Sequence, residues 1–217
     1  RRWYISEFVW DSWESKRRKG SARLPVVSRM PTIATPMDQR KGFLFLGRWV
    51  ENKGIRVLLE AYRRLSPNSE DWPMIMLGDG PLRPEVERMI ARNKIEGVHL
   101  PGFVSEEERH RYTREAKWMV TPPHTKEDLG LTPLEARSVR VPCIVSEDGG
   151  VMETGGPHAL RCEPGSVESL LTCLNRAVEM EEDEYERMSN LAKEDLNAYV
   201  RPLDEYADEY LKLLGKT

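Results

Sequence analysis

The sequence has few cysteines and no long apolar stretch. Its 217 residues contain three cysteines, Cys143, Cys162 and Cys173, and none of them belongs to a CxxC pair. So small and odd a set does not predict a disulfide framework or a structural zinc site, and it favours a reducing, cytoplasmic setting. No apolar run approaches the roughly 20 residues that a membrane-spanning helix needs.

The sequence also lacks an excess of charge of either sign. Its 33 Lys and Arg residues stand against 36 Asp and Glu residues, which gives a net charge of -3 at pH 7. Domains dedicated to nucleic acids are usually basic, so we expect no nucleic-acid partner. Apolar residues make up 39% and charged residues 32% of the chain, as in globular proteins with one large or two small domains.

Short apolar runs alternate with amphipathic segments from about residue 42 to residue 145. Each run has the length and closing residues of a buried strand, and each amphipathic segment has helical spacing. Alternating strands and helices predict right-handed crossovers and an open parallel α/β sheet, in which ligands bind at the carboxyl ends of the strands. The predicted strands are 43–46, 74–77, 98–100, 119–121 and 143–145.

Two carboxylates, Glu127 and Glu135, stand eight positions apart around a predicted helix start. Pro133 suits the first turn of a helix, and the free amides of such a turn attract anions. The helix dipole alone would explain one carboxylate at this place. Two carboxylates that flank Gly130 favour a ligand with both phosphate and hydroxyl groups.

Two cations, Arg48 and Lys53, lie in a turn bounded by Gly47 and Gly54 after the first predicted strand. Arginine offers a planar fork and lysine a point charge, so the pair is suited to clamping a diphosphate. Taken alone, two ordinary surface cations would be the simpler interpretation.

Two further turns follow the next strands. The segment Gly78-Asp79-Gly80 is a weak phosphate-loop signal, and a structural turn is the favoured interpretation. Two interpretations fit the segment after Gly102. Phe103 or Val104 packs on a nucleotide base, or the segment makes an ordinary core contact, and the sequence favours neither interpretation.

Taken in order, these motifs resemble the carboxyl-terminal lobe of a family-four retaining glycosyltransferase. Members of that family have two Rossmann-like lobes, which together form the GT-B fold. The resemblance covers roughly residues 41–171, and it implies an α/β fold class with a Rossmann-like open parallel sheet flanked by helices and followed by a helical tail. The matching residues are Gly47, Arg48, Lys53 and Gly54, then Gly78 to Leu82, Gly102 to Ser105, Glu127, Glu135, Gly149, Gly150 and Glu153.

The resemblance implies a role for each of these groups. Arg48 and Lys53 would hold the donor diphosphate near Gly47 and stabilise charge on the leaving group, so that no metal or other cofactor is needed. Glu127 would bind the donor sugar and is the best catalytic candidate, while Glu135 would accept the ribose hydroxyls. Amides near Gly130, Leu131 and Thr132 would contact the distal phosphate, and the backbone near Phe103 and Val104 would meet the base.

The resemblance also divides the chain. It implies that residues 1–40, with a helix at 6–15, are a remnant of the N-terminal lobe and a linker. Residues 41–200 would form the nucleotide-sugar-binding domain, in which only helical patterns follow residue 167, and residues 201–217 a C-terminal crossing helix. One departure is Arg140, which stands where the family usually has glycine.

The expected function is therefore sugar transfer from a UDP- or GDP-type donor, with UDP or GDP as bound product. An N-terminal lobe, in the same full-length chain or in a separate subunit, would hold the acceptor and provide any peripheral membrane association. The chain alone would be incomplete and inactive. The alternatives are a non-catalytic nucleotide-sugar-binding or scaffolding subunit, and a nucleotide-sugar epimerase, against which the position of Glu127 ahead of Gly130 argues.

Overall fold

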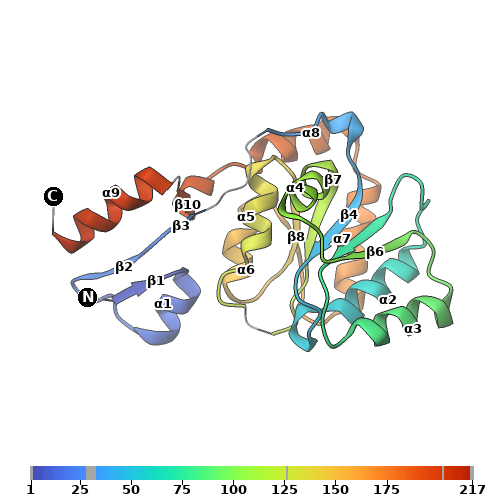
Figure 1. Ribbon diagram of the computed structural model, residues 1–217, viewed down its shortest axis with the longest axis horizontal. Helices are drawn as coiled ribbons and strands as arrows, with labels where there is room; N and C mark the ends of the chain where they lie inside the picture. The colour runs from blue at the N-terminus through green and yellow to red at the C-terminus, as the bar shows by residue number, and fades with distance from the viewer. Residues whose placement is uncertain (1, 28–32, 126, 202, 216–217) are drawn as a thin grey trace.

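A six-stranded sheet, parallel throughout, forms the centre of the protein (Figure 1). The computed structural model describes residues 2–27, 33–125, 127–201 and 203–215. The strands run in the order β6-β5-β4-β7-β8-β9. Their bounds are β4 (Lys41–Leu46), β5 (Met74–Leu77), β6 (Val98–Gly102), β7 (Ala116–Thr121), β8 (Cys143–Ser146) and β9 (Leu160–Cys162).

Helices cover both faces of this sheet because its central strands are apolar on both sides. Along β4, Phe43 and Phe45 belong to one core cluster and Leu44 to the other, as the alternation of side chains along a strand requires. The first cluster is covered by α2 (Ile55–Leu65), α3 (Arg83–Asn93), α7 (Val167–Val178) and α8 (Glu182–Leu191). The second is covered by α4 (Glu106–Glu115), α5 (Leu131–Ser138) and α6 (Gly149–Thr154).

The strand order reverses beside β4. The chain leaves β4 for β5 and β6, then returns past β4 to β7 and continues to β8 and β9. The carboxyl ends of β4 and β7 are therefore neighbours, and the helices that follow them, α2 and α5, pack on opposite faces of the sheet. Such a switch point is where ligands bind in open α/β sheets.

The predicted strands are confirmed, but several short elements were missed, among them the last strand of the sheet and the helix before it. Strand β9 and helix α6 span too few residues to show a period of their own. The prediction of only helices after residue 167 was wrong at β10 (Val200–Arg201), which pairs in parallel with β3 (Val26–Val27). Three short 3-10 helices complete the described elements: η1 (Met37–Gln39), η2 (Glu51–Lys53) and η3 (Leu196–Ala198).

The first residues form a small unit of their own beside the main sheet. Strand β1 (Arg2–Tyr4), helix α1 (Glu7–Trp13) and strand β2 (Ser21–Arg23) make a parallel β-α-β unit, which confirms the predicted helix. Helix α9 (Leu203–Leu214) lies on the same side of the molecule (Figure 1), and the rings of Trp3 and Tyr210 meet edge to face with centroids 5.2 Å apart. Within the described ranges no helix has the length and apolar character needed to cross a membrane.

The turn after α5 contains a strained residue. Arg140 has a φ of +61° in the left-handed region, which is unfavourable for any residue with a Cβ atom. Its carbonyl accepts hydrogen bonds from Arg40 Nη1 and Ser189 Oγ, each 2.6 Å away, so the surrounding structure holds the conformation. Because glycine has no Cβ atom, it would adopt this conformation without the strain.

We predict that Arg140→Gly raises the free energy of unfolding by about 0.5–1 kcal/mol, because the relief of left-handed strain exceeds the added entropy of the unfolded chain. The matched control is Arg88→Gly at an exposed position within α3, which lowers the free energy of unfolding by about 1 kcal/mol. Urea unfolding measures both. An Arg140→Gly protein no more stable than the parent would contradict the account of this turn.

Candidate functional site

The Arg48 turn rests directly on the turn after β5. Trp49 is fully buried, and its amide donates to Asp79 O at 2.9 Å. A Cβ atom on Gly78 would lie 2.0 Å from Gly47 O, so only glycine permits this approach of two backbones. The segment from Gly78 is thus a structural turn, as the favoured interpretation predicted, and it fixes the backbone on both sides of the exposed Arg48.

Lys53 and Glu127 form an ion pair across the switch point. Lys53 lies in η2 after β4, and Glu127 lies in the loop after β7. Lys53 Nζ is 2.8 Å from Glu127 Oε1 and 2.7 Å from Oε2, and about a fifth of each side chain is exposed. The structure therefore brings two predicted site residues together and places the lysine on the carboxylate.

Backbone contacts tie the two loops of this ion pair to each other. His124 N donates to Asn52 O at 3.1 Å. Gly54 begins α2 with a φ of +70°, and a Cβ atom there would lie 1.8 Å from Pro122 O. The η2 turn and the loop after β7 are consequently packed against each other at Gly54, where no side chain could fit.

The Glu127 loop is held from its other side by the start of α6. Gly150 N donates to Glu127 O at 2.6 Å. A Cβ atom on Gly149 would lie 2.6 Å from the same oxygen, and one on Gly150 would lie 2.1 Å from Asp128 O. The glycine pair therefore serves to bring the α6 backbone onto the loop.

Helix α5 begins as the sequence predicted, with Pro133 in its first turn. Gly130 is the N-cap, with a φ of +78°, and no described side chain caps this end of the helix. The first amides, at Leu131 and Thr132, thus lack a side-chain acceptor, which is the arrangement that binds anions at helix starts. Thr132 Oγ1 lies 3.2 Å from Thr121 Oγ1 at the end of β7.

Glu135 is paired with a residue that sequence reasoning missed. Arg109 Nη1, from α4, lies 2.5 Å from Glu135 Oε1, with 26% and 19% of the two side chains exposed. Arg109 also lies 3.8 Å from Glu106 of its own helix. In the sequence it is one of several charged residues of an amphipathic helix, so nothing distinguishes it from a surface cation.

The residues after β6 separate the two alternatives for this segment. Phe103 is 83% exposed and makes no core contact, whereas Val104 packs against the second core cluster. The core interpretation therefore holds for Val104 and fails for Phe103, whose ring stands free at the carboxyl edge of the sheet.

The cysteines do not contribute chemistry. All three are free and buried, and burial raises the pKa of the Cys143 and Cys162 thiols to about 12 and that of Cys173 to about 11. They stay protonated near neutral pH, so they do not act as thiolate nucleophiles. Within the described ranges, no three His, Cys, Asp or Glu side chains are grouped so that they could hold a metal ion.

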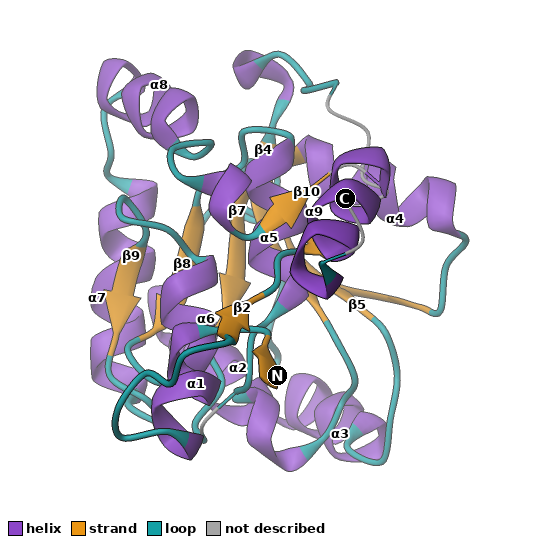
Figure 2. Ribbon diagram, turned by 90° about the vertical axis from the view of Figure 1, so that its left-hand side faces the viewer, coloured by secondary structure: helices purple, strands orange, loops and turns teal. Residues whose placement is uncertain are grey.

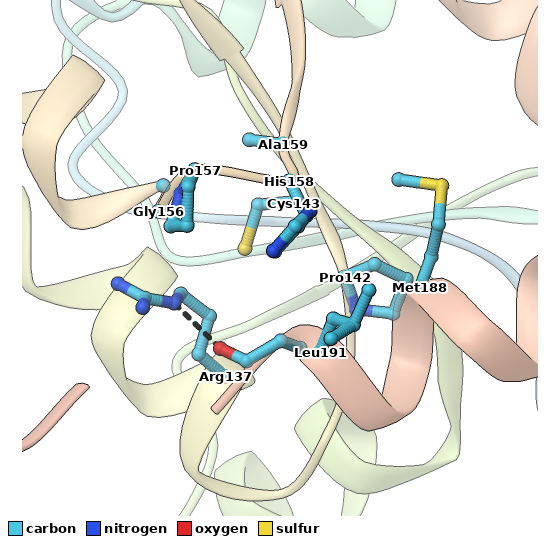
Figure 3. Close-up of a pocket in the computed structure, with 11 residues that line it drawn as sticks. Arg137, Pro142, Cys143, Gly156, Pro157, His158, Ala159, Met188 and Leu191 are labelled. Atoms are coloured by element: carbon cyan, nitrogen blue, oxygen red, sulfur yellow. Dashed lines mark hydrogen bonds between the residues drawn. The ribbon is translucent and has the colours of Figure 1, made fainter. Parts of the chain in front are cut away.

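A small cavity lies behind α5, away from this edge (Figure 3). Its volume is about 10 Å³, and its lining includes Arg137, Cys143 at the start of β8, and Met188 of α8. That volume holds about one water molecule at most, so it does not accommodate a nucleotide. Arg137 is almost fully buried there and donates to the carbonyls of Ala192 and Thr154, each at 2.8 Å, which joins α5 to the tail.

Comparison with known proteins settles the family. Residues 32–195 match the family described as glycosyl transferases group 1. The chain belongs to this family. It is 32% identical over 116 residues to the alpha-D-kanosaminyltransferase of Streptomyces kanamyceticus, an alignment that covers 53% of this chain and 30% of that protein. It is 27% identical over 178 residues to the O-antigen chain mannosyltransferase C of Escherichia coli, with 79% and 47% covered.

Solved glycosyltransferase structures share the fold. A structure of HepE from Anabaena in complex with UDP and glucose superposes with a TM-score of 0.81 at 15% identity, over 99% of this chain and 62% of that one. A mutant of TarM from S. aureus, in complex with UDP and other ligands, gives a TM-score of 0.79 at 15% identity over 97% and 43%. The expected GT-B relationship is thus confirmed, and the glycosyltransferase chain spans less than half of the two curated relatives named above.

We predict that Gly54→Ala lowers the free energy of unfolding by about 3 kcal/mol, because the new Cβ would overlap Pro122 O and the residue would keep a positive φ. The control is Gly47→Ala, whose Cβ would make ordinary contacts at 3.6 Å and 3.9 Å with the Phe45 ring. That change stays within about 1 kcal/mol of the parent. Thermal and urea unfolding measure both variants. An equal loss of stability in Gly54→Ala and Gly47→Ala would contradict the packing of these loops.

Proposed function

We propose that this chain is the donor-binding lobe of a retaining glycosyltransferase that takes sugar from a UDP- or GDP-type donor. The observation that carries the proposal is the Lys53–Glu127 pair at the switch point, with Nζ 2.7 Å from a carboxylate oxygen. Arg48 is exposed on the turn that contains Lys53, and the α5 start follows the Glu127 loop. Cations, a carboxylate and helix amides together suit a ligand with a diphosphate and hydroxyl groups.

The proposed chemistry uses these groups at different points of the donor. The bond between the sugar's anomeric carbon and the phosphate oxygen breaks, its electron pair stays on that oxygen, and negative charge grows on the diphosphate. The acceptor's hydroxyl oxygen forms the new bond to the anomeric carbon, and its proton passes to the departing phosphate oxygen. Arg48 and Lys53 stabilise this charge and take the place of a metal ion. The α5 amides near Gly130 bind the distal phosphate, and Glu127 accepts hydrogen bonds from the sugar hydroxyls.

When the donor binds, Glu127 must share Lys53 with the donor, and Glu135 must release or share Arg109. The Lys53 ammonium has three donors, so it can keep one bond to Glu127 while it turns another to a phosphate oxygen. Glu135 is held by Arg109 at 2.5 Å, and ribose hydroxyls would compete with that guanidinium. We propose that the base lies near the exposed ring of Phe103.

The neighbours support a nucleotide ligand of this kind. The HepE structures contain UDP, UDP with glucose, or UDP-glucose. Their identity to this chain is 15%, so the likeness is one of fold, and the proposal covers donors of both the UDP and the GDP type.

We further propose that a second, N-terminal lobe holds the acceptor. The unit that would face it exposes apolar side chains: Trp13 is 75% exposed, Ile5 44% and Trp3 37%. Exposed apolar surface of this kind is typical of interaction faces. On this account the chain binds the donor by itself and completes no transfer without that lobe.

Titration calorimetry with UDP, GDP and ADP tests the proposal. We expect at least one of them to bind with a 1:1 stoichiometry, because the diphosphate contacts are made within this chain. Folding is checked in the same sample by circular dichroism. Folded protein that binds none of the three would overturn the assignment of a nucleotide-sugar site.

Arg48→Ala tests the diphosphate clamp. Loss of a charged hydrogen bond costs about 1.5–3 kcal/mol, so we expect the dissociation constant of the preferred diphosphate to rise about 10- to 100-fold. Binding of the free nucleoside changes less than about twofold on the same scale. The control Arg92→Ala removes an exposed cation from α3 and leaves both constants unchanged. Equal losses for nucleoside and diphosphate would refute the clamp.

A further inference from the structure

The N-terminal unit reaches the candidate donor loop through one buried hydroxyl. Ser6 is the N-cap of α1, and its side chain is completely buried. Its Oγ accepts a hydrogen bond from Val9 N at 3.0 Å and donates one to Asp128 O at 2.6 Å. A capping serine needs only the first of these bonds. The second joins α1 to a residue 122 positions later, next to Glu127.

The side chain of Glu153 binds the N-terminus of the same helix. Its Oε2 accepts from Glu7 N at 3.0 Å and its Oε1 from Phe8 N at 2.7 Å. Amides in the first turn of a helix commonly bind acceptors from outside the helix, and a carboxylate at a helix N-terminus is favoured by the helix dipole. Because Glu153 belongs to α6, the helix that supports the Glu127 loop is also the helix that holds α1 (Figure 2).

The Glu127–Asp128 backbone is thereby held by two donors from different parts of the chain. Gly150 N binds Glu127 O at 2.6 Å, and Ser6 Oγ binds the next carbonyl at 2.6 Å. Loss of the Ser6 bond would remove a donor from the Asp128 carbonyl at a partly buried position, which is costly. A shift of α1 would pull on the loop directly.

We propose that Ser6 and Glu153 are positioning residues for Glu127, so that the N-terminal unit sets the geometry of the sugar end of the donor site. Neither side chain needs to touch the donor. The functional meaning rests on the proposed function, since Glu127 is the group placed at the sugar. As a consequence, a movement of the N-terminal unit changes the position of Glu127. The movement is carried by the contacts that Ser6 makes with Asp128 and that Glu153 makes with α1.

Hydrogen exchange of the protein without nucleotide tests the coupling. The variant is Ser6→Gly, because glycine is a tolerated N-cap and the change removes chiefly the hydroxyl that binds Asp128 O. We expect the amide of Gly150, whose hydrogen bond to Glu127 O reports on the loop, to exchange about tenfold faster, while those of the central strands β4 and β5 keep their rates. The matched control is Ser12→Ala on the same helix, whose hydroxyl donates to Phe8 O, and it leaves the Gly150 rate unchanged.

Glu153→Gln gives a second, independent measurement. It replaces one acceptor oxygen by an NH₂ group that faces an α1 amide, and we expect the same local acceleration at Gly150. An unchanged Gly150 rate in both variants, or an equal acceleration throughout the sheet, would overturn the proposal. Nucleotide binding does not enter this readout, so a failure of the proposed function and a failure of the coupling are told apart.

Discussion

Close contact between backbones at the carboxyl edge of the sheet is the constraint on which the site depends. Gly54 lies against Pro122 O, and Gly149 and Gly150 lie against the Glu127–Asp128 backbone, at distances that leave no space for a Cβ atom. The loops after β4, β7 and β8 are therefore stacked on one another rather than separately exposed. The meeting of Lys53 and Glu127 follows from this stacking.

The topology of the sheet brings these loops together in the first place. Because the order reverses beside β4, the η2 turn and the Glu127 loop leave the sheet from adjacent strands. The resulting Lys53–Glu127 pair is half-buried, so its charges are screened less than those of a surface pair. An arrangement with cations, a carboxylate and an uncapped helix start at one point is what the proposed donor site requires.

The sequence was sufficient for five of the six strands of the sheet and for part of the site. Buried strands have a strong apolar signature, and Pro133 marks a helix start by its missing N–H group, so strands β4 to β8 and the start of α5 were predicted correctly. Strand β9 and helix α6 were missed because such short segments have no measurable period. The grouping of Arg48, Lys53 and Glu127 at one edge followed from parallel pairing alone.

The partners of these residues were beyond sequence reasoning. The Arg109–Glu135 and Ser6–Asp128 contacts join segments far apart in the chain, and they depend on how helices are rotated and docked. Phe103 is exposed while its neighbour Val104 packs against the core, and this difference likewise depends on the local turn. A shift of the segment by one residue would exchange the two environments.

The most direct test of the central claim is the position of the diphosphate in a crystal structure of this chain with the nucleotide that it prefers. The account predicts the phosphates between Arg48, Lys53 and the first turn of α5, with Glu127 beyond the terminal phosphate, where the sugar would be attached. A nucleotide bound anywhere else on the protein, or at this edge with its phosphates turned away from Arg48 and Lys53, would contradict it.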